Sequence, residues 1–189
     1  MLNTHRVASL AALAIALLSP MYAAAESASV TEIKVDEAIK IFKTDVKGAE
    51  VFLSQASGYL VFPRVIKIGI GIGGETGEGA LRVNGKTAGY YRTSSGSIGF
   101  QLGAQAKAIV IVFMTPESLK KFTDSDGWRI GIDGSVALID LGACKTIDSH
   151  NIKDPVVGFI FGSKGLMYNL TLEGSKIHHQ TDKGKSNSV

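Results

Sequence analysis

The stretch Lys67–Gly79, KIGIGIGGETGEG, constrains the fold more than any other part of this 189-residue chain. Isoleucine and glycine alternate through it, and alternate residues of an extended strand lie on opposite faces. One face therefore carries Ile66, Ile68, Ile70 and Ile72. We expect that face to be aliphatic core. We expect the bare glycine face to lie against a covering helix or a neighbouring strand, because glycine in a strand leaves room for a close approach.

The same stretch contains G-x-G-x-x-G at residues 69–74, the pattern of dinucleotide-binding loops. Such a loop works where a strand leads into a helix whose N-terminus receives the pyrophosphate. Here the residues that follow, ETGEGALRVNGK, have no helical apolar stripe and contain Asn84-Gly85, a strong hairpin signal. The sequence therefore predicts strands here, and no cofactor.

Short apolar runs separated by Gly, Asn, Ser or Thr continue from Gly58 onward, and their short connections predict antiparallel neighbours. One helix is expected at Thr115–Phe122, where Thr115 caps the helix and a proline occupies its first turn. Before the strands, apolar residues recur at helical spacing over 29–56, and Gly48 divides that segment. The predicted fold class is α+β: an N-terminal amphipathic helical segment packed on a large, strongly curved antiparallel β-sheet with one short inserted helix.

The N-terminal helical segment has a charged face opposite its apolar one. Ser29 and Glu32 fit a capping box at the helix start. The charged face carries Asp36, Lys40, Lys43 and Lys47. Two interpretations stay open: a solvated helix face, or a helix that lies against an anionic membrane surface, where apolar and basic faces act together.

The first residues have the pattern of a signal peptide: a charged start, an apolar run over Val7–Leu18 and a small-residue cleavage site after Ala25. We expect residues 1–25 to be removed, residues 26–180 to form one domain and residues 181–189 to be a disordered polar tail. The polar composition extends the expected disorder back to His178. The predicted location is the periplasm or the periphery of the outer membrane. The single Cys144 lies far from the cleavage site, so we expect a buried thiol and no lipid anchor.

Catalytic and metal-binding patterns are weak. No acid, base and nucleophile come together in a recognised motif. Asp124 and Asp126 superficially resemble a calcium loop, but Phe122 stands where the first acidic ligand belongs, so we predict no metal site. A hydrolase with an unrecognised site stays an alternative, and its candidate residues are Asp133, Asp140 and His150.

A basic set lies close to the glycine strand in sequence. Its members are Arg64, Lys67, Arg82, Lys86 and Arg92. They are either dispersed surface charges or, if the hairpin lies beside the glycine strand, one positive patch. The net charge of the whole chain, +3, is too small to indicate nucleic acid as a partner.

Four motifs, in this order, resemble the SYLF domain family of lipid-binding proteins. They are YLVFPRVIKIGIGIGGETGEGAL, GYYRTSSGSIGFQLGAQ, GWRIGIDGSVALIDLG and GLMYNLTLEGSKI. The resemblance covers roughly residues 49–177 and implies a one-domain α+β fold that binds and does not catalyse. It also implies membrane contact through an amphipathic N-terminal helix, as in eukaryotic relatives that bind phosphoinositide membranes, some of which bind actin filaments. The signal pattern resembles the exported bacterial branch, although the anchor cysteine common there is missing.

We therefore expect an exported non-enzymatic domain that binds anionic lipid head groups or an acyl chain. The resemblance places membrane contact on Lys40, Lys43 and Lys47, with Arg64 and Lys67 beside the VFP turn as further candidates. The main alternative is a protein–protein adaptor of the cell envelope, analogous to the filament-binding relatives.

Overall fold

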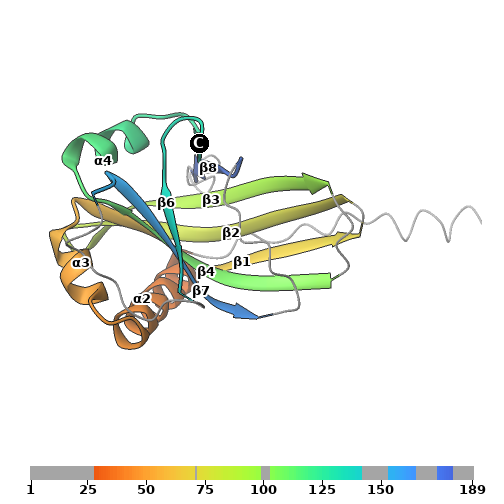
Figure 1. Ribbon diagram of the computed structural model, residues 1–189, viewed down its shortest axis with the longest axis horizontal. Coiled ribbons are helices and arrows are strands. Elements are labelled where there is room, and N and C mark those ends of the chain that lie inside the picture. The colour runs from red at the N-terminus through yellow and green to blue at the C-terminus, as the bar shows by residue number, and fades with distance from the viewer. Residues whose placement is uncertain (1–27, 71, 99–102, 142–152, 165–173, 181–189) are drawn as a thin grey trace, which may run out of the picture.

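The computed structural model describes residues 28–70, 72–98, 103–141, 153–164 and 174–180 (Figure 1). Within these ranges the helices are α2 (Ala28–Asp45), α3 (Ala49–Gln55) and α4 (Pro116–Thr123). The strands are β1 (Gly58–Ile70), β2 (Ile72–Val83), β3 (Lys86–Ile98), β4 (Gly103–Phe113), β5 (Trp128–Arg129), β6 (Ala137–Asp140), β7 (Val156–Lys164) and β8 (Lys176–His179).

The described strands form one strongly curved sheet in the order β5-β8-β3-β2-β1-β4-β7-β6 (Figure 1). The pairings are antiparallel except that of β6 with β7, which is parallel. The predicted α+β class and the curved, mostly antiparallel sheet are confirmed. The parallel pair departs from the expectation.

The hairpin between β2 and β3 forms at the predicted place. Asn84 and Gly85 both have positive φ, +50° and +73°, which a two-residue turn of the primed type requires. The register closes tightly, with Val83 opposite Lys86. This turn places β2 and β3 side by side along most of their length.

Helices α2 and α3 cover one face of the sheet at one end of the strands (Figure 1). Gly48 separates them with φ +92°, as predicted from its position inside the helical pattern. The buried stripe of α2 contains Val35, Ala38 and Phe42, and the Phe42 ring lies 5.2 Å from that of Phe159 on β7. Packing against the sheet therefore selects the apolar face of α2 that the periodicity indicated.

The predicted capping box at the start of α2 is wrong. Ser29 already lies inside the helix, and the Glu32 carboxylate accepts a hydrogen bond from the Thr87 hydroxyl on β3 at 2.7 Å. The same carboxylate pairs with the Arg82 guanidinium on β2. Glu32 is therefore held by tertiary contacts with β2 and β3.

Helix α4 and the segment after it cover the opposite face of the sheet. Phe122 on α4 stacks on Phe113 of β4 at 4.8 Å and meets Trp128 edge-on at 5.6 Å. Thr115 caps the helix as predicted: its hydroxyl accepts from the Ser118 amide, and the Ser118 side chain completes the box.

The replacement Thr115→Ala is expected to destabilise the protein by about 1 kcal/mol, because it leaves an amide of the first turn of α4 without its acceptor. Urea unfolding of the two proteins measures the difference. Thr123→Ala at the other end of α4 is the matched control, since that hydroxyl only bonds back to a helix carbonyl, that of Lys120. Equal stabilities for the Thr115 variant and the unaltered chain would contradict the capping role.

The aliphatic face of the glycine strand is not core, contrary to the prediction. Ile68 is 63% exposed and Ile66 is only partly buried, while the side chains of Ile70 and Ile72 lie outside the described part. The reason is that β1–β4 extend well past the ends of α2 and α3 (Figure 1), so none of the described helices lies over this end of the sheet. The alternation of isoleucine and glycine predicts which side chains share a face of the strand. It does not predict whether a helix covers that face.

Two later glycines of the same stretch, Gly77 and Gly79, lie close to a neighbouring strand, while what lies against the bare face of Gly69, Gly71 and Gly73 stays a prediction. An added Cβ at Gly77 would lie 2.8 Å from the Arg64 carbonyl oxygen, and one at Gly79 would lie 2.1 Å from the Val61 carbonyl oxygen. These two glycines therefore allow the backbone of β1 to approach β2 closely.

The polar end of the domain is more ordered than its composition indicates. His178 and His179 belong to β8, and the Gln180 amide donates to the Tyr90 carbonyl, so the prediction of disorder from His178 is wrong. The predicted signal peptide, Cys144, His150 and the tail 181–189 lie outside the described residues. No helix in the described ranges is both long and apolar enough to cross a membrane.

Candidate functional site

A bulge in β1 determines which face of the sheet receives Arg64. Phe62 pairs with Ile109 and Val65 pairs with Lys107, so β1 advances by three residues where β4 advances by two. The extra residue falls at Pro63, which has no amide hydrogen to offer a sheet partner.

The bulge turns the side chain of Arg64 toward α2. Phe62 and Val65 both belong to the core on the α4 face, although they are three positions apart in the strand. In a regular strand their side chains would lie on opposite faces. Because the bulge shifts the alternation by one residue, Arg64 lies on the face that α2 covers, beside Pro63.

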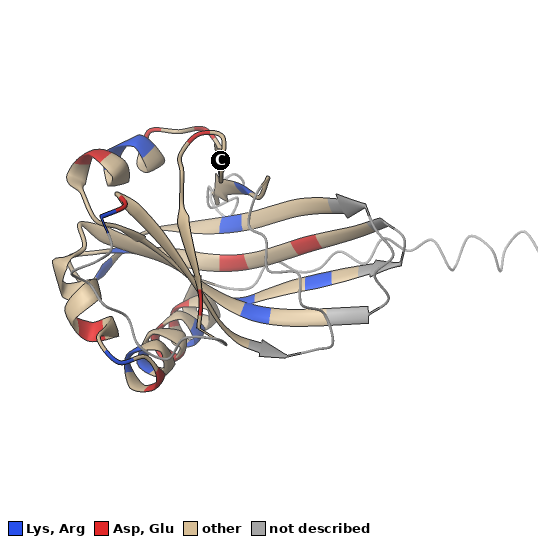
Figure 2. Ribbon diagram, in the orientation of Figure 1, with Lys and Arg blue, Asp and Glu red and all other residues tan. Residues whose placement is uncertain are grey.

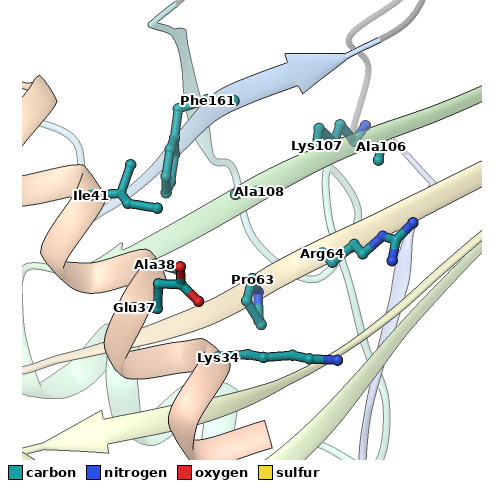
Figure 3. A pocket seen from close by; sticks show the side chains of 11 residues that line it. Lys34, Glu37, Ala38, Ile41, Pro63, Arg64, Ala106, Lys107, Ala108 and Phe161 are labelled. Carbon is teal, nitrogen blue, oxygen red and sulfur yellow. The ribbon is translucent and has the colours of Figure 1, made fainter.

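Pro63 and Arg64 line a pocket between α2, β1, β4 and β7 with a volume of about 460 Å³ (Figure 3). We call it the α2 pocket. It is lined by Lys34, Glu37, Ala38, Ile41, Pro63, Arg64, Ala106, Lys107, Ala108, Phe161 and Gly162. Its volume lies within the roughly 300–1,000 Å³ typical of small-molecule sites.

Small side chains on β4 create the hollow. On the α2 face, β4 presents Val112 and Val110 beneath the helices, both fully buried in the core. Further along the same face it presents Ala108 and Ala106, which line the pocket. The Phe161 ring forms a wall and is held by its contact with Phe42, 5.4 Å between centroids. The pocket is thus pre-formed by fixed side chains and has an apolar floor.

Charged groups stand at the sides of this apolar floor. Figure 3 shows the side chains of Lys34 on α2 and Arg64 on β1 extending in the same direction, with Glu37 one turn along the helix from Lys34. Arg64 is exposed. The third cation of the lining, Lys107, is paired with Glu75. Lys34, Arg64 and Glu37 therefore leave a local charge of +1 beside an apolar pocket. This is the pattern that a ligand with an apolar body and an anionic end requires.

Arg82 anchors α2 to the sheet. Its guanidinium, 8% exposed, pairs with Glu32 at 2.7 Å and with Asp36 at 2.5 Å, and it donates to the Thr87 hydroxyl. Burial of the Glu32 carboxyl by itself raises the pKa of that group, but hydrogen bonds from Thr87, Tyr90 and Arg82 outweigh burial and hold the pKa below its ordinary value. Arg82 is therefore occupied within the fold.

The predicted stripe Lys40, Lys43 and Lys47 is exposed, but it does not meet Arg64. At 100° per residue, Lys43 lies on the flank of α2 that carries Asp36, on the side of Arg82, and it pairs with Glu50 of α3 at 3.4 Å. Lys47 follows the end of α2, in the connection to α3. The pocket lies on the other flank, with Lys34 and Ile41. Lys40 lies between the flanks, on the outer crest of the helix.

Lys67 lies on the opposite face of the sheet from Arg64, because it shares the face of Val65 beyond the bulge. On that face it stands opposite Glu75 of β2 and Gln105 of β4. Glu75 pairs instead with Lys107 at 2.9 Å, and both of these side chains are buried. The structure therefore brings Arg64 to the α2 surface and separates Lys67 from it.

The wider basic set does not form one patch. Figure 2 shows Lys and Arg positions scattered over the strands with acidic positions among them. Glu78 stands between Arg64 and Arg92 in the sheet. Arg92 pairs with Glu78 on the neighbouring strand, and Arg82 is buried against α2. Of the alternative hydrolase residues, Asp133 accepts a hydrogen bond from the Arg129 amide in its own loop at 2.7 Å. The described His, Cys, Asp and Glu residues include no group that could hold a metal ion.

Most of the pocket lining was not predicted from the sequence. Lys34 lies six residues before Lys40 and on the other flank of α2, and the alanines of β4 are weak strand formers. Two signals were available: the proline in VFPRV, which marks a bulge or an edge, and the alternate small residues of GAQAKA.

A curved sheet with a pre-formed apolar pocket under one helix, and cations at the side of that pocket, defines an α+β binding domain. The model of the Ysc84 family, described as "Las17-binding protein actin regulator", matches residues 94–186. The match agrees with the resemblance to the SYLF domain, which is thereby confirmed. The match begins within β3, so α2, α3, β1 and β2 precede it. No curated protein matches the chain.

Proposed function

We propose that this chain is an exported, non-enzymatic protein of the cell envelope that binds anionic lipid membranes through α2 and the adjoining part of β1. The observation that carries the proposal is the combination of exposed apolar and basic side chains on that surface. Ile33 is 69% exposed and Ile41 is 42% exposed, and Lys34, Lys40 and Arg64 stand beside them.

Both classes of side chain matter for binding at a membrane surface. Apolar groups bury into the boundary between head groups and acyl chains, and each nearby Lys or Arg adds about 1 kcal/mol at an anionic leaflet. Lys43 is paired with Glu50, and Lys47 lies beyond the end of α2. We therefore place the contact on the crest and pocket flank of α2, with Lys43 and Lys47 adding long-range attraction.

The double charge reversal Lys40→Glu/Arg64→Glu is expected to weaken binding to vesicles of mixed neutral and anionic phospholipid at least about tenfold, because two attractive charges become repulsive. Co-sedimentation at rising salt measures it, and the gap between variant and unaltered chain should narrow as salt screens the charges. The matched control is Lys120→Glu/Lys121→Glu on α4, which covers the other face of the sheet. Equal losses in both variants would contradict a defined contact surface.

The substitution Ile33→Ser measures the apolar contribution to vesicle binding separately from the charges. Its control is Ile132→Ser, because Ile132 is 65% exposed in the segment between β5 and β6. A loss confined to Ile33→Ser is expected. Vesicle binding that neither substitution reduces would leave only a non-specific electrostatic association.

The description of the Ysc84 family supports a protein partner as the second candidate function, because it names Las17 binding and actin regulation. This alternative requires binding in the absence of lipid. Co-sedimentation of the purified, delipidated chain with actin filaments tests it directly, and insensitivity of that binding to Lys40→Glu/Arg64→Glu would separate it from the lipid function.

A further inference from the structure

We propose that the α2 pocket binds one fatty acid molecule, with the acyl chain on the apolar floor and the carboxylate between Lys34 and Arg64. The inference deepens the proposed lipid-binding function, on which it rests, by naming a ligand that is bound singly and inside the protein. It concerns the hollow beneath α2 rather than the outer surface of that helix.

The floor of the pocket has the chemistry of an acyl-chain site. Ala38, Pro63, Ala106, Ala108 and Phe161 line it with carbon. Burial of apolar surface yields roughly 25 cal/mol per Å², and a flexible chain can follow an elongated hollow between a helix and a sheet. The volume of about 460 Å³ accommodates one such chain.

The position of the hollow is specific to this end of β4. Two and four residues beyond Ala108, Val110 and Val112 fill the same face of β4 beneath the helices, and both side chains are completely buried. Alanines in place of larger residues leave the space open, and Phe161 is held against Phe42 at its side. Because its walls are already fixed by the core, a ligand does not have to order them.

The charges favour a carboxylate. A guanidinium and a carboxylate form two parallel hydrogen bonds, and Arg64 is the only arginine lining the described pocket. Glu37 lines the pocket beside the two cations, so the local charge of +1 matches a singly charged head group better than a doubly charged phosphate monoester. The bulge at Pro63 is what brings Arg64 to this position, since a regular strand would turn it to the other face.

Titration of the delipidated full chain with dodecanoate, below the concentration at which it forms micelles, tests the inference by calorimetry. We expect one molecule bound per chain, and at least tenfold weaker binding of dodecanol, which lacks the carboxylate. Dodecyl phosphate is the third probe. Tighter binding of dodecyl phosphate than of dodecanoate would overturn the assignment of a carboxylate, and equal binding of dodecanol would overturn the role of the cations.

Two variants locate the site. Ala106→Phe fills the hollow and Arg64→Gln removes the cation, and each is expected to weaken dodecanoate binding tenfold or more. The controls lie outside the pocket lining: Thr76→Phe on β2 and Arg129→Gln on β5. Thermal unfolding verifies that each variant folds, and Arg64 is exposed, so its replacement leaves the core intact. Dodecanoate binding unchanged in Ala106→Phe and Arg64→Gln would overturn the proposal.

The outcomes separate this inference from the proposed function. Ala106→Phe should abolish dodecanoate binding while vesicle co-sedimentation persists, because the outer crest of α2 is unaltered. Vesicle binding by the unaltered chain without any binding of dodecanoate overturns the pocket assignment alone. Dodecanoate binding that both pocket variants lose, in a chain that does not sediment with vesicles, supports the pocket and contradicts membrane docking.

Discussion

Gly79→Ala is expected to lower the free energy of unfolding by about 3 kcal/mol or more, at the upper end of the usual cost of overpacking. A Cβ at this position would lie 2.1 Å from the Val61 carbonyl oxygen and 2.7 Å from the Phe62 ring. The obstructing atom is backbone, so no rotamer change relieves the clash. The bulge of β1 must move, and with it the segment that carries Arg64 to the α2 pocket.

Urea unfolding of Gly79→Ala measures this cost, and the same substitution at two other glycines of the sheet provides the control. An added Cβ at Gly96 has no neighbour within 4 Å, and one at Gly74 has only a carbonyl oxygen at 3.9 Å. Alanine at these two positions should be neutral or stabilise by about 0.4–1 kcal/mol, since it restricts the unfolded chain. A Gly79→Ala protein as stable as Gly74→Ala would contradict the close approach of β1 and β2.

The contrast among these glycines shows what the sequence could and could not predict. From the sequence, each glycine could be a place where another segment of backbone comes close. Whether a position requires glycine depends on the strand beside it. Gly77 and Gly79 lie opposite the bulge, where backbone and side chains of β1 crowd them, whereas Gly74 and Gly96 face open space. The bulge position depends on Pro63 and on the pairing of two strands, so it is not a property of the glycine pattern.

Local features were predicted well because their causes are local. The Asn84-Gly85 turn, the break at Gly48 and the cap at Thr115 each follow from backbone conformations or hydrogen bonds within a few residues. The faces of residues beyond Pro63 were not predictable in the same way. One extra residue in a strand reverses the face of every residue after it, which separates Arg64 from Lys67.

The candidate site was predicted only in part for the same reason. The sequence predicted a basic helix and an adjoining strand as the contact region, and the structure places Arg64 beside that helix. It did not give the flank of α2 that the pocket occupies, because the flank depends on how Arg82 anchors Glu32 and Asp36. The α2 pocket itself was not predictable, because it forms where Ala106 and Ala108 of β4 pack near α2, a helix that is distant from them in the sequence.

The second large effect is expected at the buried ion pair of the opposite face. Lys107 on β4 and Glu75 on β2 lie 2.9 Å apart across β1, and their side chains are 4% and 7% exposed. Taking both charges out of water is costly, and the pair persists because each compensates the other. Removal of one partner leaves an uncompensated charge. Glu75→Gln and Lys107→Met are therefore each expected to destabilise by about 3–5 kcal/mol.

The double variant Glu75→Leu/Lys107→Met should recover most of that loss, because two apolar side chains of similar volume leave no buried charge. A double-mutant cycle in urea, built with Glu75→Leu and Lys107→Met as the single variants, measures the coupling directly. The control is the exposed pair of Lys120 and Asp124, whose side chains are 76% and 60% exposed, and whose disruption by Lys120→Met should cost well under about 1 kcal/mol. Single variants at Glu75 and Lys107 that cost no more than this control would show that water reaches the pair.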